Sequence, residues 1–325
     1  MLLLTDCPER ALRLLPPSLA AAIEPGAALE PAERALWQAL GGSEPPSLAT
    51  LAARAELGGW SRLCIVGDAP RSQFDVLRDA FPDALGSAEP VACLALAGRD
   101  FHGHRGRPWQ AVDGNLHLSV GFVPQLGAAE LLPALVMLPA VALVAAVAEV
   151  TAGAVRPGIK WVNDLLCQGR KVGGVLTTTS TRGERARSAV LGIGLNVRAA
   201  PAVAPTPFVP EVGALGELVS PIPSLGALLW ALLAELGRRI AELERSGPEP
   251  LWAAYRRDSL VGGAEVRIYD ESMGERELGG PWPEPLARGV VEELEPDLGL
   301  RLRGRADRVA RGRLAFEHAC RRFGL

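Results

Sequence analysis

One stretch of this chain carries no charged side chain over 18 positions. Residues 131–148 read LLPALVMLPAVALVAAVA, which reaches the minimum length of a membrane-spanning helix. Pro139 fits the first turn of a helix that runs to about Ala152 and ends at Gly153. We therefore predict a helix that is buried under a sheet, and no association with a membrane.

The sequence on both sides of this stretch supplies the sheet. Strand-like and helix-like runs alternate from Arg62 onward, and a proline-rich loop over 199–223 precedes a last helix at 225–245. The predicted strands are 62–67, 91–98, 115–122, 158–164, 171–180 and 189–197, and 73–81 is a predicted helix. This pattern predicts an α/β (α+β) fold, a mixed sheet with packed helices.

Beyond about residue 258 the pattern changes to short strand-like runs, which are typical of a small β-barrel. Before Arg62, residues 32–40 and 47–57 predict two short helices without a third, recognition-type helix, so DNA binding is not expected. We therefore divide the chain into an N-terminal helical extension of unknown role (1–60), a catalytic domain (61–258) and a small C-terminal β domain (259–325). The N-terminal segment holds no catalytic motif, so its deletion is expected to leave activity intact.

Charge and cysteine content exclude several classes of protein. The net charge of −3 argues against a chain built to hold nucleic acid. The five cysteines include no C-x-x-C pair, so neither a disulfide framework nor a zinc site is indicated. No basic region precedes the apolar N-terminus, so we expect no signal peptide and a reducing, cytoplasmic location.

Lysine is almost absent from the chain. Of the 34 basic residues only Lys160 and Lys171 are lysines, and they lie eleven positions apart. Lysine presents a compact charge and arginine a planar fork, so the two are not interchangeable at a tight site. The two lysines are therefore candidates for a function that arginine cannot perform.

Three motifs carry candidate chemistry. The first is GRDFHGHRGRPW at 98–109, in which glycines allow close backbone approach and arginines match phosphate or carboxylate oxygens. We expect this loop to close over an anionic ligand.

The second motif combines Lys160-Trp161-Val162-Asn163-Asp164 with Lys171-Val172-Gly173-Gly174. A lysine beside a carboxylate that can bind Mg²⁺ suits adenylate formation, in which a carboxylate attacks the α-phosphorus of ATP. A simple hairpin with Asn163-Asp164 in its turn is the alternative, but it does not account for the two lysines.

The third motif is LGIGLNV at 191–197, in which alternating glycines mark close approach of another group. A dinucleotide-binding fingerprint would need a third glycine that opens a helix, and this sequence lacks it.

The order and spacing of these motifs, together with GNLHLS at 114–119, resemble the biotin protein ligases, or biotin–[acetyl-CoA-carboxylase] ligases, of the biotin/lipoate protein ligase family. The resemblance covers about 62–258, and the C-terminal strands resemble the family's SH3-like domain. It implies a class II synthetase-like catalytic domain that uses biotin, ATP and Mg²⁺ to form biotinyl-5′-AMP. The biotinyl group would then pass to a lysine of the biotin carboxyl carrier protein of acetyl-CoA carboxylase.

The same resemblance implies roles for individual residues. Lys171, Asp164 and Arg107 are expected to be catalytic, and Asp164 is expected to support Mg²⁺. The residues expected to bind biotin or nucleotide are Ser72, Gln73, Gly98, Arg99, Gly103, His104, Arg105, Gly106, Trp109, Asn115, Lys160, Trp161, Asn163, Gly173, Gly174, Gly192, Gly194 and Asn196.

The chain departs from the family pattern at five places. Asp100-Phe101-His102 is inserted in the loop, His104 stands where the family has arginine, and Val162 replaces proline. The usual Ser-Thr-Asn turn reads Arg71-Ser72-Gln73, and Ala95 and Leu96 replace glutamines. These changes leave the adenylation centre intact but alter the biotin pocket.

Two alternatives therefore stay open: a lipoate or octanoate ligase on the same fold, and a degenerate protein that binds biotin or a carrier domain without turnover. The R-R-x-S-G-G-G motif of lipoate ligases is not seen. No winged-helix domain is recognised, so a repressor role is not expected. A homodimer is compatible with the resemblance.

Overall fold

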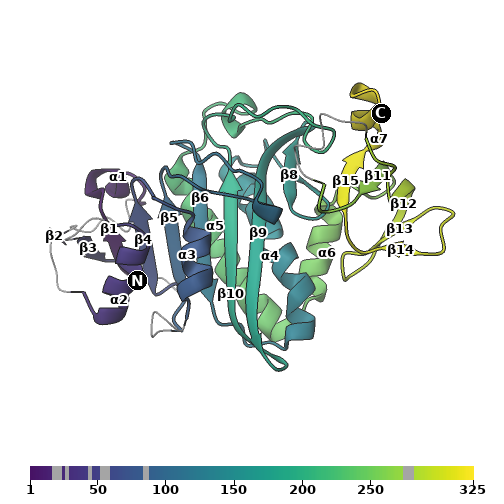
Figure 1. Ribbon diagram of the computed structural model, residues 1–325. Coiled ribbons are helices and arrows are strands. Elements are labelled where there is room, and N and C mark those ends of the chain that lie inside the picture. Colours follow the sequence, from purple (N-terminus) through teal and green to yellow (C-terminus); the bar gives the residue numbers. More distant parts are fainter. Residues whose placement is uncertain (17–23, 26–28, 43–45, 52–58, 83–87, 274–281) are drawn as a thin grey trace.

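The computed structural model describes residues 1–325 except 17–23, 26–28, 43–45, 52–58, 83–87 and 274–281 (Figure 1). The described part contains a ten-stranded mixed sheet with the order β2-β3-β1-β4-β5-β6-β10-β9-β8-β7. Its strands are β1 (Leu2–Thr5), β2 (Glu24–Pro25), β3 (Ser47–Thr50), β4 (Arg62–Val66), β5 (Val91–Ala95), β6 (Leu116–Phe122), β7 (Gly158–Lys160), β8 (Asp164–Cys167), β9 (Arg170–Arg182) and β10 (Arg185–Leu195). The mixed α/β fold predicted from the alternating pattern is confirmed.

Helices cover both faces of this sheet. They are α1 (Pro8–Leu12), α2 (Pro31–Ala39), α3 (Gln73–Ala80), α4 (Ala128–Val150), α5 (Leu225–Ser246) and α6 (Glu249–Asp258). In β4, Leu63 and Ile65 face the core shared with α4, α5 and α6, whereas Cys64 and Val66 face the core shared with α2 and α3. This alternation is the period of two that a strand buried on both faces requires.

Helix α4 is the predicted buried helix. Its segment Leu131–Val150 is long and apolar enough to cross a membrane, but most of it is buried inside the protein, against β9, β10, α5 and α6. The predicted start in the turn at Pro139 is wrong, because α4 begins at Ala128 and holds Pro133 and Pro139 in its interior. Apolar packing on nearly all sides outweighs the backbone hydrogen bonds that the two prolines cannot donate.

The N-terminal segment belongs to the main sheet. Strand β1 lies between β3, which is antiparallel to it, and β4, which is parallel to it. The helix predicted over 47–57 is wrong where it can be compared, because Ser47–Thr50 is a strand, and residues 52–58 lie outside the described part. The helix predicted at 32–40 is confirmed as α2.

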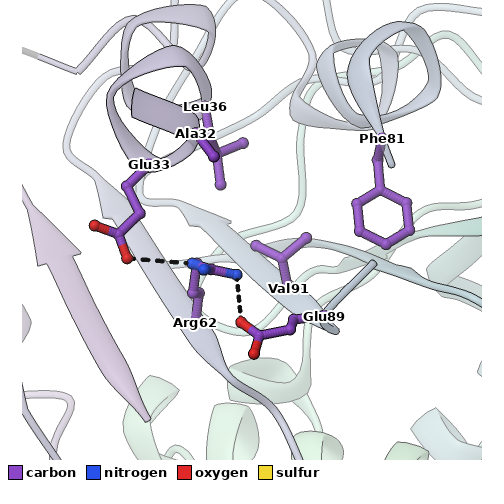
Figure 2. A pocket seen from close by; sticks show the side chains of 7 residues that line it. All are labelled: Ala32, Glu33, Leu36, Arg62, Phe81, Glu89 and Val91. Atoms are coloured by element: carbon purple, nitrogen blue, oxygen red, sulfur yellow. Dashed lines mark ion pairs between the residues drawn. The ribbon is translucent and has the colours of Figure 1, made fainter. Parts of the chain in front are cut away.

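A small hollow marks the junction of α2 with the sheet (Figure 2). Beside it the Arg62 guanidinium lies 2.8 Å from Glu89 and 3.5 Å from Glu33 of α2. The hollow has a volume of about 10 Å³, which holds no more than a water molecule. The hollow is therefore a packing feature of the N-terminal segment rather than a ligand site.

The predicted C-terminal β domain is a five-stranded antiparallel sheet with the order β14-β13-β12-β11-β15. Its elements are β11 (Glu265–Tyr269), β12 (Ala287–Leu294), β13 (Leu300–Leu302), β14 (Arg308–Val309), β15 (Arg313–Phe316) and the helix α7 (Glu317–Arg322). The domain lies beyond β7 and β8, at the end of the main sheet opposite the N-terminus (Figure 1).

Candidate active site

A cavity of about 650 Å³ lies between the main sheet and the C-terminal domain. Fourteen of the predicted site residues line it: Ser72, Gly103, His104, Arg107, Trp109, Lys160, Trp161, Asn163, Asp164, Lys171, Gly174, Gly192, Gly194 and Asn196. Seven others do not: Gln73, Gly98, Arg99, Arg105, Gly106, Asn115 and Gly173. The three sequence motifs therefore meet at one site that is large enough for a ligand.

The two lysines of the chain meet at one carboxylate in this cavity. The Lys171 ammonium lies 2.6 Å from Oδ1 of Asp164, and the Lys160 ammonium lies 3.8 Å from Oδ2. Burial by itself would raise the pKa of Asp164, but the charges of Lys171 and Lys160 outweigh burial and lower it. Asp164 is therefore ionised at neutral pH, with a cation beside each oxygen.

Lys160 is the more buried of the two lysines, with 5% of the residue exposed. Burial lowers its pKa to about 8, against the raising effect of the Asp164 charge. Its ammonium also donates a 2.9 Å hydrogen bond to the carbonyl oxygen of Phe208, in the proline-rich loop. This bond and the burial of the residue fix the position of the Lys160 ammonium.

A tight hairpin carries this cluster. The predicted single strand over 158–164 is wrong: β7 and β8 pair through Lys160 and Asp164, with a turn at residues 161–163. The alternative hairpin is present: it places Lys160 beside Asp164, and the next strand, β9, brings Lys171 to the same carboxylate. Residues 160–164 therefore form the turn and also supply Lys160 and Asp164 to the charge cluster.

Side chains of distant elements hold the turn. The Asn163 amide donates to Val175 O at 2.8 Å, and the Tyr255 hydroxyl donates to Val162 O at 2.8 Å. The Trp161 indole donates to Leu298 O of the C-terminal domain at 2.7 Å. Asn163 and Trp161 thus position the hairpin, a contribution that the motif alone does not reveal.

The other two asparagines behave differently from each other. The Asn115 side-chain carbonyl accepts from the backbone N–H groups of Val197 and Arg198, at 2.9 and 3.0 Å, so Asn115 ties the start of β6 to the chain after β10. Asn196 donates to Gly213 O at 3.0 Å, but its buried Oδ1 has no hydrogen-bond partner in the described structure. A buried acceptor without a donor is costly, so a ligand N–H or O–H is the expected partner of Asn196.

The alternating glycines of β10 make room for aromatic rings. A Cβ at Gly194 would lie 2.5 Å from the Trp109 ring, and a Cβ at Gly192 would lie 3.0 Å from the Phe74 ring. The predicted close approach of another group is confirmed, and that group is in part the protein's own aromatic side chains. Trp109 donates from its indole N–H to Nδ1 of His117 at 3.3 Å, which fixes the ring over the strand.

Several cavity residues escaped the sequence analysis. His117 of β6 lines the cavity beside Ser119, and burial lowers the pKa of its imidazole. Phe101 of the loop insertion and Phe208 of the proline-rich loop line it too. His117 lies inside the GNLHLS motif and could have been singled out there, whereas Phe208 carries no local signal.

The cavity offers little to a metal ion on its own. No group of three or more His, Cys, Asp or Glu side chains in the described part of the chain is arranged to bind one. Of the carboxylates that line the cavity, Glu271 pairs with Arg105 and Asp297 pairs with Arg308. Asp164 is paired as well, with Lys171 and Lys160, and of the three carboxylates it alone belongs to the second sequence motif. It could supply one ligand to a Mg²⁺ ion that takes its other ligands from substrate phosphates and water.

Known proteins share these features. Residues 88–196 match the family model "Biotin/lipoate A/B protein ligase family". The chain is 36% identical over 179 residues to a biotin–[acetyl-CoA-carboxylase] ligase of Paracoccus denitrificans, which covers 54% of this chain and 71% of that protein. It is 32% identical over 221 residues to the ligase of the same name in Mycobacterium tuberculosis (strain ATCC 25618 / H37Rv). This match covers 65% of this chain and 75% of that protein.

Among solved structures, the biotin protein ligase from Aquifex aeolicus in complex with biotin and ATP is similar in fold. The TM-score is 0.61 at 19% sequence identity, with 79% of this chain and 99% of that chain covered.

Proposed function

The chain belongs to the biotin/lipoate A/B protein ligase family, and from this premise we propose that it is an ATP-dependent biotin protein ligase. In the first step a carboxylate oxygen of biotin attacks the α-phosphorus of ATP, and pyrophosphate leaves. In the second step a lysine amine of a carrier protein attacks the acyl carbon of biotinyl-5′-AMP. An amide bond forms and AMP leaves.

One observation carries this proposal: both lysines of the chain converge on Asp164 inside the large cavity. Negative charge moves from the carboxylate to the phosphate oxygens as the first step proceeds. Lys171 is placed to stabilise that charge, and Asp164 holds its ammonium in position. Lys160 is anchored by Phe208 O, so it acts from a fixed position.

Other residues suit the nucleotide. The unpartnered Oδ1 of Asn196 supports an interaction with a donor group of ATP, and Trp109 supplies an aromatic ring to the same cavity. Arg107 and His104 line the cavity from residues 98–109, which we call the covering loop. Burial and the nearby Arg107 charge lower the pKa of His104, so its imidazole is largely neutral at pH 7.5 in the ligand-free protein.

Mg²⁺ would be held by Asp164 together with the ATP phosphates. When bound, the ion neutralises phosphate charge and favours departure of pyrophosphate. The protein residues around it orient the reactants and exclude water.

The partner follows from the same proposal. The relatives are named for acetyl-CoA carboxylase, and we propose a biotin carboxyl carrier domain as the acceptor. We also propose a cytoplasmic protein that does not bind DNA, and a homodimer stays a prediction. Residues 61–258 would form the catalytic domain and 259–325 the C-terminal domain, with residues 1–60 joined to the catalytic sheet through β1.

Pyrophosphate exchange tests the proposed function. Purified protein is incubated with ATP, Mg²⁺ and labelled pyrophosphate, with either biotin or lipoate. Exchange that depends on biotin is the expected result. Exchange with lipoate alone would instead identify a lipoate ligase, and biotin binding without exchange would identify a degenerate binder.

A further inference from the structure

The covering loop contains the three inserted residues Asp100, Phe101 and His102, and these make contacts of their own. We propose that His102 and Asp75 are positioning residues that hold the base of the covering loop in place over the cavity before any substrate binds. The proposal deepens the function proposed above, because it concerns how the same site retains its adenylate.

The base of the loop is a short hairpin. The backbone N–H of Trp109 donates to the carbonyl oxygen of Phe101 at 2.8 Å, and the backbone N–H of Gly103 donates to the carbonyl oxygen of Arg107 at 2.8 Å. His102 and Pro108 form an antiparallel bridge between them. The insertion thus supplies one of the two strands of this base, and residues 104–106 form its tip.

The Phe101 ring holds the base of the loop by packing contacts. A Cβ at Gly98 would lie 2.6 Å from the Phe101 ring and 2.8 Å from Ala69 O, so the glycine permits tight packing. The ring also meets His117 edge-on, with centroids 5.8 Å apart. The loop is therefore packed against the sheet by its own inserted side chain.

The His102 side chain holds the base of the loop through a hydrogen bond and a ring contact. Its Nε2 donates to Oδ2 of Asp75 at 2.9 Å, and its ring lies edge-on to Phe74, with centroids 6.3 Å apart. The side chains of His102 and Asp75 are 25% and 19% exposed, so water competes only weakly for this bond. Arg78 of α3 pairs with the other oxygen of Asp75 and holds the carboxylate in place.

The tip of the loop is held differently. Arg105 pairs with Glu271 of the C-terminal domain at 2.6 Å, but its side chain is 54% exposed. An exposed ion pair of this kind contributes little stability and opens readily. The base therefore stays in place while the tip moves to admit substrates, and the anchor at Asp75 sets how long the loop covers the adenylate.

Hydrogen–deuterium exchange of the ligand-free protein tests this anchor without any need for activity. We compare wild type with His102→Ala, Asp75→Ala and the double variant. The matched control is Asp79→Ala on the same helix. It removes an exposed carboxylate, which pairs with Arg71 and Arg78.

Amides of residues 98–109 should exchange about tenfold faster in either single variant, the factor expected for one lost charge-assisted hydrogen bond. The double variant should show no further increase, because both changes remove the same bond. His102→Gln, which keeps an N–H donor, should recover part of the protection. Release of biotinyl-AMP should accelerate about as much as loop exchange does, while the melting temperature stays close to that of Asp79→Ala.

Three results would overturn the proposal. Loop exchange in wild type could match that of an unstructured peptide, or His102→Ala could behave as Asp79→Ala does. Faster exchange spread over the whole protein would show instead that the pair serves general stability. A failure of biotin-dependent pyrophosphate exchange would refute the proposed function but leave the loop measurement valid.

Discussion

Replacement of Lys171 by arginine keeps the charge and should still abolish most of the activity. The Lys171 ammonium lies 2.6 Å from Asp164, and its side chain is only 22% exposed, so the charge occupies one defined point. A guanidinium is planar and longer, so it spreads its charge away from that point. Loss of one aligned electrostatic contact costs about 3 kcal/mol in the transition state, which is roughly a hundredfold in rate.

The chain offers a matched control one residue away. Arg170 pairs with Glu217 at 2.8 Å and with Glu211 at 3.2 Å, and it does not line the cavity. Arg170→Lys is therefore the reverse exchange on the same strand, outside the site, and we expect it to leave adenylation within about twofold of wild type.

Biotin-dependent pyrophosphate exchange at saturating ATP and biotin measures the first step alone. Melting temperatures of both variants show whether each remains folded. A rate for Lys171→Arg within about threefold of wild type, or an equal loss in Arg170→Lys, would refute the argument that a point charge is required at this position.

Three further predictions follow from other parts of the structure. Gly194→Ala places a Cβ 2.5 Å from the Trp109 ring, so the ring must move, and the KM for ATP should rise roughly tenfold in steady-state assays; an unchanged KM would contradict this. Glu317→Gln leaves Arg267 without its buried carboxylate and should cost about 3 kcal/mol of unfolding free energy at pH 7. Arg267 lowers the pKa of Glu317 to about 2, so the ionised carboxylate stabilises the fold fully above pH about 4.3 and ceases to do so as pH falls to about 2. The melting temperatures of wild type and Glu317→Gln should therefore converge at acid pH, and a difference that stays constant with pH would count against the ion pair. Deletion of residues 1–50 removes the buried Leu3 and Leu4 and exposes the edge of β4, so the truncated protein should aggregate, whereas a soluble, active product would show that β1 is dispensable.

The last of these predictions reverses the expectation drawn from the sequence. The run of apolar residues at the N-terminus gives four residues of strand, too few for a periodic pattern to be distinguished from a helix. Its partners are β3 and β4, and β4 begins about sixty positions further on. Pairing over such a separation is set by tertiary packing, which a local pattern does not contain.

The central motifs could be predicted because their chemistry is local. The lysines at 160 and 171, Asp164 and the glycines of β10 lie within consecutive strands, so sequence order and spatial order agree there. Asn163 and Asn115 show the limit of that argument: the residue type signals importance, but only the structure assigns each amide to backbone groups of another element.

Several of the departures from the family pattern lie in the covering loop or line the cavity. The inserted Phe101 and His102, together with His104, lie in the covering loop, and Val162 and Ser72 line the cavity. In the part of the chain that the structure describes, none of them forms a hydrogen bond or ion pair with Lys171 or Asp164, whose side chains come from β9 and β8. The strands thus fix the charges of Lys171 and Asp164, whereas the covering loop controls access and contributes Arg107, whose charge also acts on Asp164. Substitutions of Phe101, His102 and His104 should therefore change the lifetime of the bound adenylate much more than the rate at which it forms.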